Sequence, residues 1–382
     1  MSQAADLFAS VYGTGREVAE FSAPGRVNLI GEHTDYNNGL VLPFAIDART
    51  HVAIARNDDG VVRLVSAQRP ESVRTLPVAD VGPGPDMDWA SYPFGIFWAL
   101  SQAGYELGGA DIAVDSDVPV GAGLSSSAAL ECAVGLALAT AFGHGIPLEA
   151  IARLSQRAEN DYVGMPCGLM DQMASAVCRA GHVLYFDVGA ETMENIPFDP
   201  SAVGLTVLTI DTKAHHSLAD GEYAKRRASC ERAAGLLGLN SLSDIAFDSL
   251  AENLARLDDE QLVRRVRHVV TENERVRRVV ARLRTGDTAS IGPDLTASHA
   301  SLRDDYEVSA PELDVAVDAA LGAGALGARM TGGGFGGSVV ALVPSAAVEE
   351  LGRAVSAAFA AKGLTAPVLR TVVPAEGARA DA

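Results

Sequence analysis

The order of hydrophobic and polar positions predicts a chain of short strands and helices. A nearly continuous apolar run, Ala128–Ala141, is too long for a strand and predicts a buried helix. Leu148–Tyr162 carries an apolar stripe at helical spacing, which predicts a second helix. The other elements predicted in this half are a helix at 92–103 and strands at 17–22, 51–55, 61–66, 111–117, 183–186 and 205–210.

The C-terminal half differs because its helices are longer and rich in arginine. The pattern predicts helices at 222–237, 258–284, 311–321 and 346–361, and strands at 338–343 and 368–373. Since no regular β-α-β rhythm is present, we expect an α+β fold. We place a boundary near residues 200–215, which gives domains at 1–205 and 206–382. Residues 81–88 are rich in turn formers and predict a loop, and the small, polar tail at 375–382 is predicted to be frayed.

Composition narrows the function classes. The 382 residues are 48% hydrophobic, which is enough apolar mass for a folded core and excludes a disordered chain. The formal net charge of −19 disfavours nucleic-acid and membrane partners, which are themselves anionic. No apolar run reaches the length of a membrane span, and residues 1–13 show no secretion signal. The four cysteines form no CxxC pair, so we expect reduced thiols and a cytoplasmic protein.

The segment Pro119–Leu130, PVGAGLSSSAAL, is the most informative local signal. Its small residues let backbone N–H groups approach an anion, and the N-terminus of the predicted buried helix adds its unpaired N–H groups. It is not a Walker A loop, because no Gly-Lys-Ser/Thr sequence closes it. On this segment alone, phosphate binding and a serine-capped buried helix after a tight turn remain equally good interpretations.

A second polar segment, Ala23–Gly39, reads APGRVNLIGEHTDYNNG. Its consecutive residues Glu32, His33, Thr34 and Asp35 offer the directional donors and acceptors that sugar hydroxyls need. The upstream Arg26 suits a transferring phosphoryl group, whose charge spreads over several oxygens. The simpler interpretation, favoured without other information, is a polar hairpin loop.

Two isolated carboxylates have a structural and a chemical interpretation each. Asp171 lies among apolar neighbours, so it is either a positioned, desolvated carboxylate or an acid at a helix N-terminus. Glu159 borders the inward stripe of its predicted helix, where a carboxylate is costly unless it is paired. It either binds Mg²⁺ or pairs with Arg153 or Arg157. A glycine-rich stretch at 332–337, GGGFGG, is either a second close-approach loop at a nucleotide site or a bend into a strand.

Together these segments resemble the GHMP small-molecule kinases. Gly25–Gly39 resembles the signature of the branch of that family that phosphorylates galactose, and Gly221–Glu231 resembles a further segment of the same branch. Pro119–Leu130 resembles the family's phosphate loop, and Met330–Val343 resembles its third motif. The similarity runs in order over about residues 20–345, which is most of the chain.

The resemblance implies a two-domain α+β fold with the active site in the cleft between the domains. The N-terminal domain would be like domain 2 of ribosomal protein S5, and the C-terminal domain would be ferredoxin-like. The implied reaction moves the γ-phosphoryl of ATP to the C1 hydroxyl of α-D-galactose with Mg²⁺, the first step of galactose catabolism. By position, Arg26 and Asp171 would be catalytic, and Ser127 and Glu159 would bind Mg²⁺. The implied sugar-binding residues are Glu32, His33, Thr34, Asp35, Gly168 and Tyr223, and the implied phosphate loop is Gly121, Ala122, Gly123, Leu124, Ser125, Ser126 and Ser127.

Several alternatives stay open at this point. The substrate could be a related sugar such as N-acetylgalactosamine or arabinose, or the chain could be a non-catalytic sensor of sugar and ATP. The uninterrupted sequence Ser125–Ala129 favours an enzyme, because the sensors of this family lack two residues there. Asp171 would act either as a general base or by orienting the hydroxyl. Asp211–His216 departs from the family pattern, and the adenine pocket has no assignment. We expect a monomer or weak homo-oligomer with a small-molecule partner, galactose, and with neither nucleic acid nor membrane.

Overall fold

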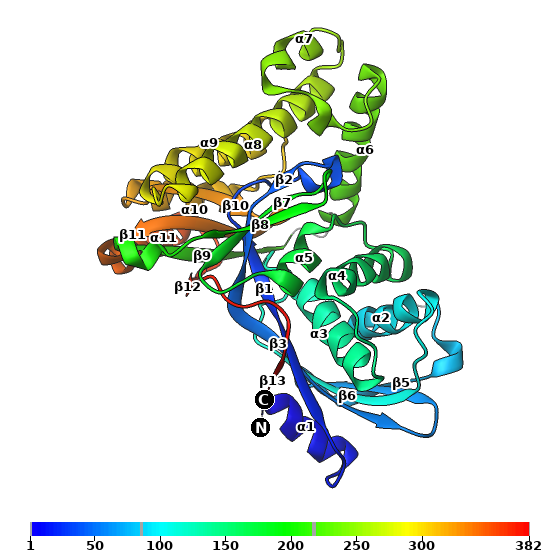
Figure 1. The fold of residues 1–382 in the computed structure, drawn as a ribbon. Helices are drawn as coiled ribbons and strands as arrows, with labels where there is room; N and C mark the ends of the chain where they lie inside the picture. Colours follow the sequence, from blue (N-terminus) through cyan, green and yellow to red (C-terminus); the bar gives the residue numbers. More distant parts are fainter. Residues whose placement is uncertain (1, 85–86, 216–218, 382) are drawn as a thin grey trace.

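A computed structural model of the chain describes residues 2–84, 87–215 and 219–381 (Figure 1). It is an α+β protein, as predicted. The first of its sheets has the strand order β13-β1-β3-β6-β4-β5, in which only the β4–β6 pair is parallel. Its strands are β1 Ala19–Asn28, β3 Pro43–Asn57, β4 Val61–Ser66, β5 Arg69–Pro77, β6 Gly109–Ser116 and β13 Arg379–Asp381.

Helices cover both faces of this sheet because its strands bury side chains on alternate sides. Val52 and Ile54 of β3 face the main apolar core, whereas the intervening Ala53 faces a smaller core under the N-terminal helix. Figure 1 shows α2, α3, α4 and α5 gathered on one side of the sheet and α1 on the other. These helices are α1 Gln3–Tyr12, α2 Ser91–Gln102, α3 Ser126–Ala141, α4 Leu148–Arg157 and α5 Met170–Val177.

The C-terminal half is built on a four-stranded antiparallel sheet in the order β10-β11-β9-β12. A small sheet of order β2-β7-β8 lies between the two halves. The strands are β2 Leu40–Val41, β7 His182–Asp187, β8 Thr192–Pro197, β9 Leu205–His215, β10 Gly327–Thr331, β11 Gly336–Pro344 and β12 Val368–Val372. The helices are α6 Ala219–Leu237, α7 Leu250–Leu254, α8 Glu260–Arg284, α9 Gly292–Asp304, α10 Pro311–Gly322 and α11 Val348–Ala361. Short helical turns are η1 Asp35–Asn37, η2 Val78–Asp80, η3 Asp88–Ala90, η4 Ala158–Val163, η5 Pro200–Val203, η6 Leu242–Asp244, η7 Phe247–Ser249, η8 Ala289–Ile291 and η9 Ser345–Ala347.

The two halves share a continuous apolar core at the end of β1. Val27 and Leu29 pack in the same buried cluster as Val276 of α8 and Val340 of β11. The buried guanidinium of Arg329 donates to the backbone oxygens of Asn28 and Leu29, which ties β10 to β1. The chain that follows β1 is therefore held against the C-terminal half. The proposed division at 205/206 falls where β9 begins, and it stays a prediction.

The C-terminal tail is ordered, and the prediction that it is frayed was wrong. β13 pairs antiparallel with β1, and Arg49 donates to the backbone oxygens of Glu376 and Gly377. The physical reason is that β1 would otherwise be an edge strand with unpaired backbone groups. A tail whose only hydrophobic residues are alanines can still satisfy those groups, and Ala378 is buried in the main apolar core.

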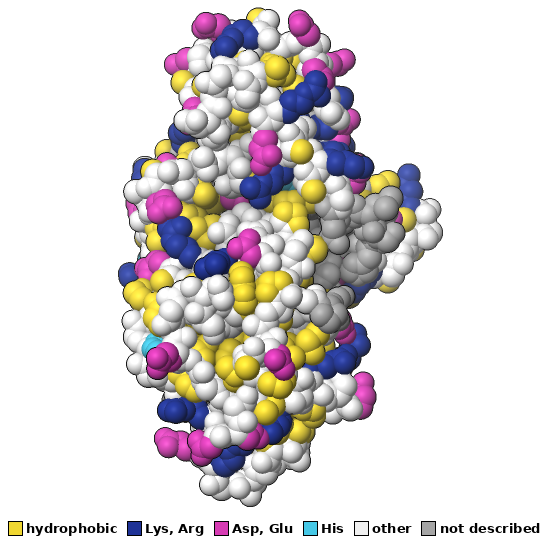
Figure 2. Space-filling view, turned by 90° about the vertical axis from the view of Figure 1, so that its right-hand side faces the viewer, with side chains coloured by type: hydrophobic (Ala, Val, Ile, Leu, Met, Phe, Trp, Pro, Cys, Tyr) yellow, Lys and Arg dark blue, Asp and Glu magenta, His cyan; other side chains and the backbone are white. Residues whose placement is uncertain are grey.

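Two other predicted segments differ in detail. The helix predicted at 148–162 is α-helical only to Arg157 and continues as the π-helical turn η4. In the predicted loop at 81–88, residues 85–86 lie outside the described residues, as does His216 at the end of the segment that departs from the family pattern. None of the helices within the described ranges is long and apolar enough to cross a membrane. Figure 2 shows one face of the molecule, where acidic and basic side chains are interspersed rather than separated by sign.

Candidate active site

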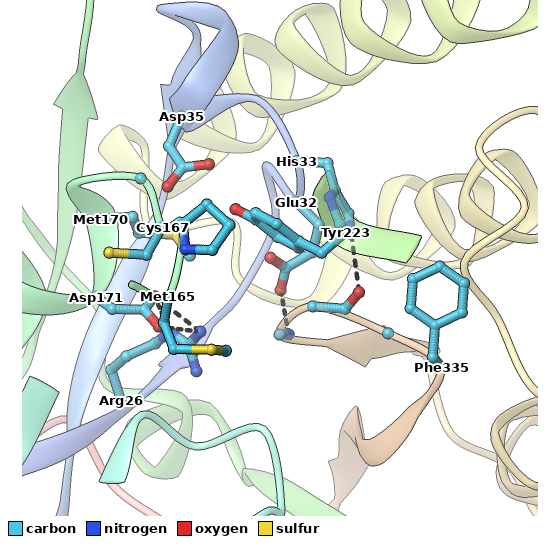
Figure 3. A pocket seen from close by; sticks show the side chains of 15 residues that line it. Arg26, Glu32, His33, Asp35, Met165, Cys167, Met170, Asp171, Tyr223 and Phe335 are labelled. Carbon is cyan, nitrogen blue, oxygen red and sulfur yellow. Dashed lines mark hydrogen bonds and ion pairs between the residues drawn. The ribbon is translucent and has the colours of Figure 1, made fainter. Parts of the chain in front are cut away.

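A cavity of about 210 Å³ lies where the two halves meet (Figure 3). Its size suits a small ligand, since pockets for drug-sized molecules begin at roughly 300 Å³. Segments far apart in the sequence form its walls: the chain around β1, the start of α5, α6 and the glycine-rich stretch before β11. The lining residues are Arg26, Glu32, His33, Asp35, Met165, Pro166, Cys167, Gly168, Met170, Asp171, Tyr223, Gly332, Gly333, Gly334 and Phe335.

One wall of the cavity is an arginine–aspartate pair. Arg26 Nε and Nη2 donate to the two carboxylate oxygens of Asp171, each over 2.9 Å, in the bidentate geometry that guanidinium groups favour. Arg26 Nη1 also donates to the Gly123 carbonyl over 2.6 Å, and Ser125 Oγ donates to Asp171 over 2.6 Å. The Arg26 side chain is 4% exposed and that of Asp171 is 30% exposed, so the carboxylate faces the cavity. Asp171 also lies in the first turn of α5, as its structural interpretation predicts, and its chemical role stays a prediction.

Several residues of the glycine- and serine-rich segment before α3 adopt left-handed backbone conformations. Gly121 and Gly123 have φ values of 73° and 72°, and Ser125 has φ 60°. Ser125 occupies the N-cap position of α3, but its hydroxyl bonds Asp171 instead of the helix. The serine-capped helix is therefore the wrong interpretation, and the first N–H groups of α3 have no side-chain cap.

The second glycine-rich stretch packs against the first. A Cβ on Gly332 would lie 2.8 Å from the Gly123 carbonyl oxygen, so only glycine permits this approach. Ser338 of β11 donates to the Ala122 carbonyl over 2.7 Å. The GGGFGG stretch thus supports the glycine- and serine-rich segment before α3 from the C-terminal half.

Glu32 is fixed by the C-terminal half as well. Its Oε1 accepts from the Gly332 N–H over 2.7 Å and from the Thr331 hydroxyl over 3.1 Å, and Arg329 Nη1 lies 3.5 Å away. All of these contacts use Oε1, so Oε2 is the oxygen that a ligand hydroxyl can approach.

Asp35 is a buried carboxylate that depends on a glycine opposite it. A Cβ at Gly168 would overlap the Asp35 carboxylate, so this position admits no side chain. Burial raises the pKa of Asp35 to about 6, and the negative charges of Asp171 and Glu32 act in the same direction. The group is therefore mostly ionised at neutral pH and can accept hydrogen bonds from hydroxyls.

His33 and Tyr223 form an aromatic side of the cavity. Burial lowers the pKa of His33 to about 3, so its ring is neutral. Its Nε2 donates to the Gly333 carbonyl over 3.1 Å, which leaves Nδ1 to accept from the Tyr36 hydroxyl over 2.7 Å. The Tyr223 ring packs against His33 with centroids 5.5 Å apart. Both nitrogens of His33 thus have protein partners, and the ring offers its surface to the cavity.

Thr34 differs from its neighbours because it does not line the cavity. Its side chain is buried, and the hydroxyl bonds the carbonyls of Gly31 and Leu40. In this structure the residue closes the loop that carries Glu32 and Asp35.

Glu159 is buried beneath the start of α3. Its Oε2 accepts from Gln172 Nε2 over 2.6 Å. Burial and the charge of Asp171 raise the pKa of Glu159 to about 7, and a hydrogen bond with Ser127 acts in the opposite direction. Arg153 pairs with Glu191, and Arg157 lies near Asp161. The interpretation of Glu159 as a partner for either arginine is therefore wrong.

A second cavity of about 280 Å³ adjoins the first turn of α3, and sequence reasoning did not find it. Trp89, Tyr92 and Leu130 give it an apolar wall, and Ser126 and Ser127 lie at its edge. Both aromatic residues follow the turn-rich segment at 81–88, where Tyr92 begins a predicted helix, and nothing in the sequence indicated that they line a cavity. The sequence likewise did not indicate that Met165, Cys167, Met170 and Phe335 line the first cavity, although Met170 and Phe335 lie in segments that the sequence analysis singled out.

Comparisons with known proteins place the chain in a family. Residues 91–179 match the family described as GHMP kinases N terminal domain, and residues 279–361 match GHMP kinases C terminal. Residues 6–56 match the galactokinase galactose-binding signature.

Relatives match over nearly the whole chain. A galactokinase of Streptomyces coelicolor is 54% identical over 98% of this chain and 97% of its own length. A galactokinase of Mycobacterium tuberculosis is 44% identical over 94% of this chain and 98% of its own length.

Solved structures agree with the curated relatives. The crystal structure of Lactococcus lactis galactokinase complexed with galactose matches with a TM-score of 0.94 and 33% identity, covering 98% of each chain. The mevalonate kinase of Methanococcus jannaschii shares the fold, with a TM-score of 0.67 at 18% identity over 94% of this chain and 98% of its own. The chain belongs to the galactokinases of the GHMP kinase family.

Proposed function

We propose that this protein transfers the γ-phosphoryl group of ATP to the C1 hydroxyl of α-D-galactose, giving α-D-galactose 1-phosphate and ADP. One observation carries the proposal. The Arg26–Asp171 pair and the phosphate-loop segment meet at one end of a cavity whose other walls hold the carboxylates of Glu32 and Asp35. In the transfer, the bond between the γ-phosphorus and the ADP oxygen breaks as the bond to the sugar oxygen forms.

Arg26 and Asp171 act on the reacting atoms. Arg26 carries part of the negative charge that spreads over the transferring phosphoryl oxygens. Asp171 accepts the hydrogen bond of the C1 hydroxyl and aims its oxygen at the phosphorus. Because both Asp171 oxygens already accept hydrogen bonds from Arg26 and Ser125, we favour orientation over early proton abstraction, with the hydroxyl proton passing to Asp171 or to a phosphoryl oxygen only as the new bond forms.

The nucleotide lies along the N-terminus of α3. The uncapped N–H groups of that helix and the amides of Gly121–Ser127 hold the phosphates without any lysine. The adenine base occupies the second cavity, where Trp89 and Tyr92 offer aromatic surface.

Ser127 and Glu159 suit Mg²⁺ because they supply hard oxygen ligands beside the expected phosphates. Glu159 is 7% exposed, and a cation would offset the cost of a carboxylate at that depth. When bound, Mg²⁺ neutralises phosphate charge. Within the described residues, no group of three or more His, Cys, Asp or Glu side chains could hold a metal, so substrate phosphates would complete the coordination.

Glu32, Asp35 and Tyr223 recognise the sugar, with Gly168 giving it room. Glu32 Oε2 and the Asp35 carboxylate accept hydroxyl hydrogen bonds, and the aromatic side contacts the apolar face of the ring. His33 keeps the aromatic side in place through its bonds to Gly333 and Tyr36.

A substrate panel tests the proposal. ADP release is measured with galactose, glucose, N-acetylgalactosamine and arabinose, with and without Mg²⁺, and the product is identified by phosphorus NMR. We expect galactose to give the highest kcat/KM and a 1-phosphate product. A higher kcat/KM with another sugar would show that this other sugar, and not galactose, is the substrate. Binding of galactose and ATP without ADP release would show that the protein is a non-catalytic sensor.

We further propose a cytoplasmic protein, a monomer or weak homo-oligomer, that is divided at residues 205/206. The four cysteines are free thiols, and three of them are buried, which suits a reducing compartment. Sedimentation analysis would measure the oligomeric state, and limited proteolysis would locate the division.

A further inference from the structure

We propose that Gln172 is a positioning residue, which holds the Glu159 carboxylate in place from the buried side and is itself braced by Glu131. The inference rests on the proposed function, in which Glu159 binds the metal. It concerns how the chain fixes that carboxylate and not the ligand itself.

The three side chains meet beneath the phosphate-loop segment. Gln172 Nε2 donates to Glu159 Oε2 over 2.6 Å and to Glu131 Oε2 over 3.3 Å. A weaker contact of 3.7 Å joins the same nitrogen to the Cys167 sulfur. Glu131 and Gln172 have no exposed surface, and neither lines either cavity near the site. They therefore act through Glu159 and not on a substrate.

Stability does not explain this arrangement. Glu131 and Gln172 lie among the apolar residues Cys132 and Met173, where polar groups are costly. Moreover, Gln172 Oε1 is buried without a hydrogen-bond partner, and burial together with the Glu159 charge raises the pKa of Glu131, whose carboxyl group also hydrogen-bonds Glu159 directly. An apolar pair of similar volume would pack here at lower cost. The two residues are more easily understood as groups that set the geometry of Glu159.

The backbone around these residues supports the same conclusion. Glu159 lies in the π-helical turn η4, and such turns are frequent at functional sites. Gln172 follows Asp171 directly in α5, so one helical turn carries both the partner of Arg26 and the amide that holds Glu159. The start of α5 thereby fixes the position of the metal ligand relative to the carboxylate that faces the sugar.

The test replaces Gln172 without changing its length. Gln172→Met removes both donated hydrogen bonds and keeps the volume. The matched control is Ser175→Ala in the same helix, which removes a buried hydrogen bond to the Pro24 carbonyl that does not involve Glu159. We compare the Mg²⁺ dependence of kcat, the affinity for galactose alone, and binding of Mn²⁺ with ADP followed by electron paramagnetic resonance.

In Gln172→Met we expect weaker Mn²⁺ binding and a higher Mg²⁺ concentration for half-maximal activity, each by about tenfold. Galactose affinity should stay at the wild-type value. The control Ser175→Ala should bind Mn²⁺ and depend on Mg²⁺ as the wild-type protein does. Glu131→Gln retains the shape of the brace and should give a smaller change in the same direction, so it serves if Gln172→Met does not fold.

The inference is overturned if Gln172→Met changes the metal readouts no more than Ser175→Ala does, or if it weakens galactose binding equally. That result would leave the proposed function intact whenever the wild-type protein phosphorylates galactose. If the wild-type protein did not phosphorylate galactose, the proposed function would be wrong. The Mn²⁺-binding measurement would still decide whether Gln172 positions Glu159.

Discussion

The two ends of the cavity are held in different ways. At the sugar end, Glu32 is fixed by Gly332 and Thr331, which belong to the C-terminal half. At the transfer end, Arg26 and Asp171 hold each other and the loop before α3, all within the N-terminal half. Under the proposed function, recognition depends on how the two halves meet. The direct contacts between Arg26 and Asp171 lie inside one half, although Gly332 and Ser338 of the other half pack against the loop before α3. Changes at the transfer end should therefore lower kcat, and changes at the sugar end should mainly raise KM.

The largest effect is expected for Asp171→Asn. The amide keeps the volume but cannot accept from Arg26 on both atoms, and it removes the carboxylate that faces the cavity. We expect kcat to fall by about 10³-fold or more, with the melting temperature little changed. Steady-state kinetics and circular dichroism measure both quantities. Turnover at the wild-type rate would remove Asp171 from the chemistry.

Arg26→Lys should have the next largest effect. Lysine keeps the charge but cannot bridge both Asp171 oxygens and the Gly123 carbonyl together. We expect kcat to fall by about 10²-fold, with a much smaller change in galactose KM. If the substitution changed KM alone, Arg26 would be a binding group and the contrast between the two ends would fail.

At the sugar end, Gly168→Ala introduces a Cβ where the Asp35 carboxylate lies. Loss of a hydrogen bond to a charged group should weaken galactose binding by about 10- to 100-fold and affect kcat less. Calorimetry measures the affinity. Gly145→Ala, where the new Cβ meets open space, is the control and should bind galactose normally. Unchanged affinity in Gly168→Ala would place the sugar elsewhere.

The smallest effect is a dependence of galactose binding on pH. The pKa of Asp35 is raised to about 6, so the accepting carboxylate is present above that pH and is lost as the pH falls through it. We expect the affinity for galactose, measured without nucleotide, to drop by about tenfold per unit below pH 6. Asp35→Asn should bind weakly at every pH and show no such step. An equal step in that variant would assign the titration to another group.

The same raised pKa affects folding with the opposite sign. Because the pKa of Asp35 in the folded protein, about 6, lies above its ordinary value of 3.8, Asp35 favours the folded state at low pH and loses that contribution as the pH rises through 6. Acid conditions should thus weaken sugar binding without any loss of stability from this residue.

Sequence reasoning succeeded where the chemistry lies in contiguous segments. Residue types and spacing singled out the run from Glu32 to Asp35 and the loop before α3, but on those grounds alone a polar hairpin and a capped helix remained as alternatives, and the binding roles of these segments stay predictions. Arg26 and Asp171 are far apart in the sequence, so only the family resemblance linked them. The brace formed by Glu131 and Gln172 escaped detection because each residue, taken alone, is an ordinary polar residue in a helix.

Other features depend on tertiary packing and leave no pattern in the sequence. The π-helical turn at Glu159 continues the inward stripe of α4, so periodicity predicts one uninterrupted helix. The cavity beside Trp89 exists only because α2, α3 and β6 meet there. The pairing of Arg379–Asp381 with β1 is made by backbone groups, and the spacing of hydrophobic residues does not predict it.

That terminal pairing constrains how the molecule can move. The polypeptide passes between the two halves before Leu205 and passes back after Val372, where it ends against β1. This second covalent crossing, held by the pairing with β1, adds to the apolar core that the two halves share. We expect deletion of the last strand to loosen the contact between the halves.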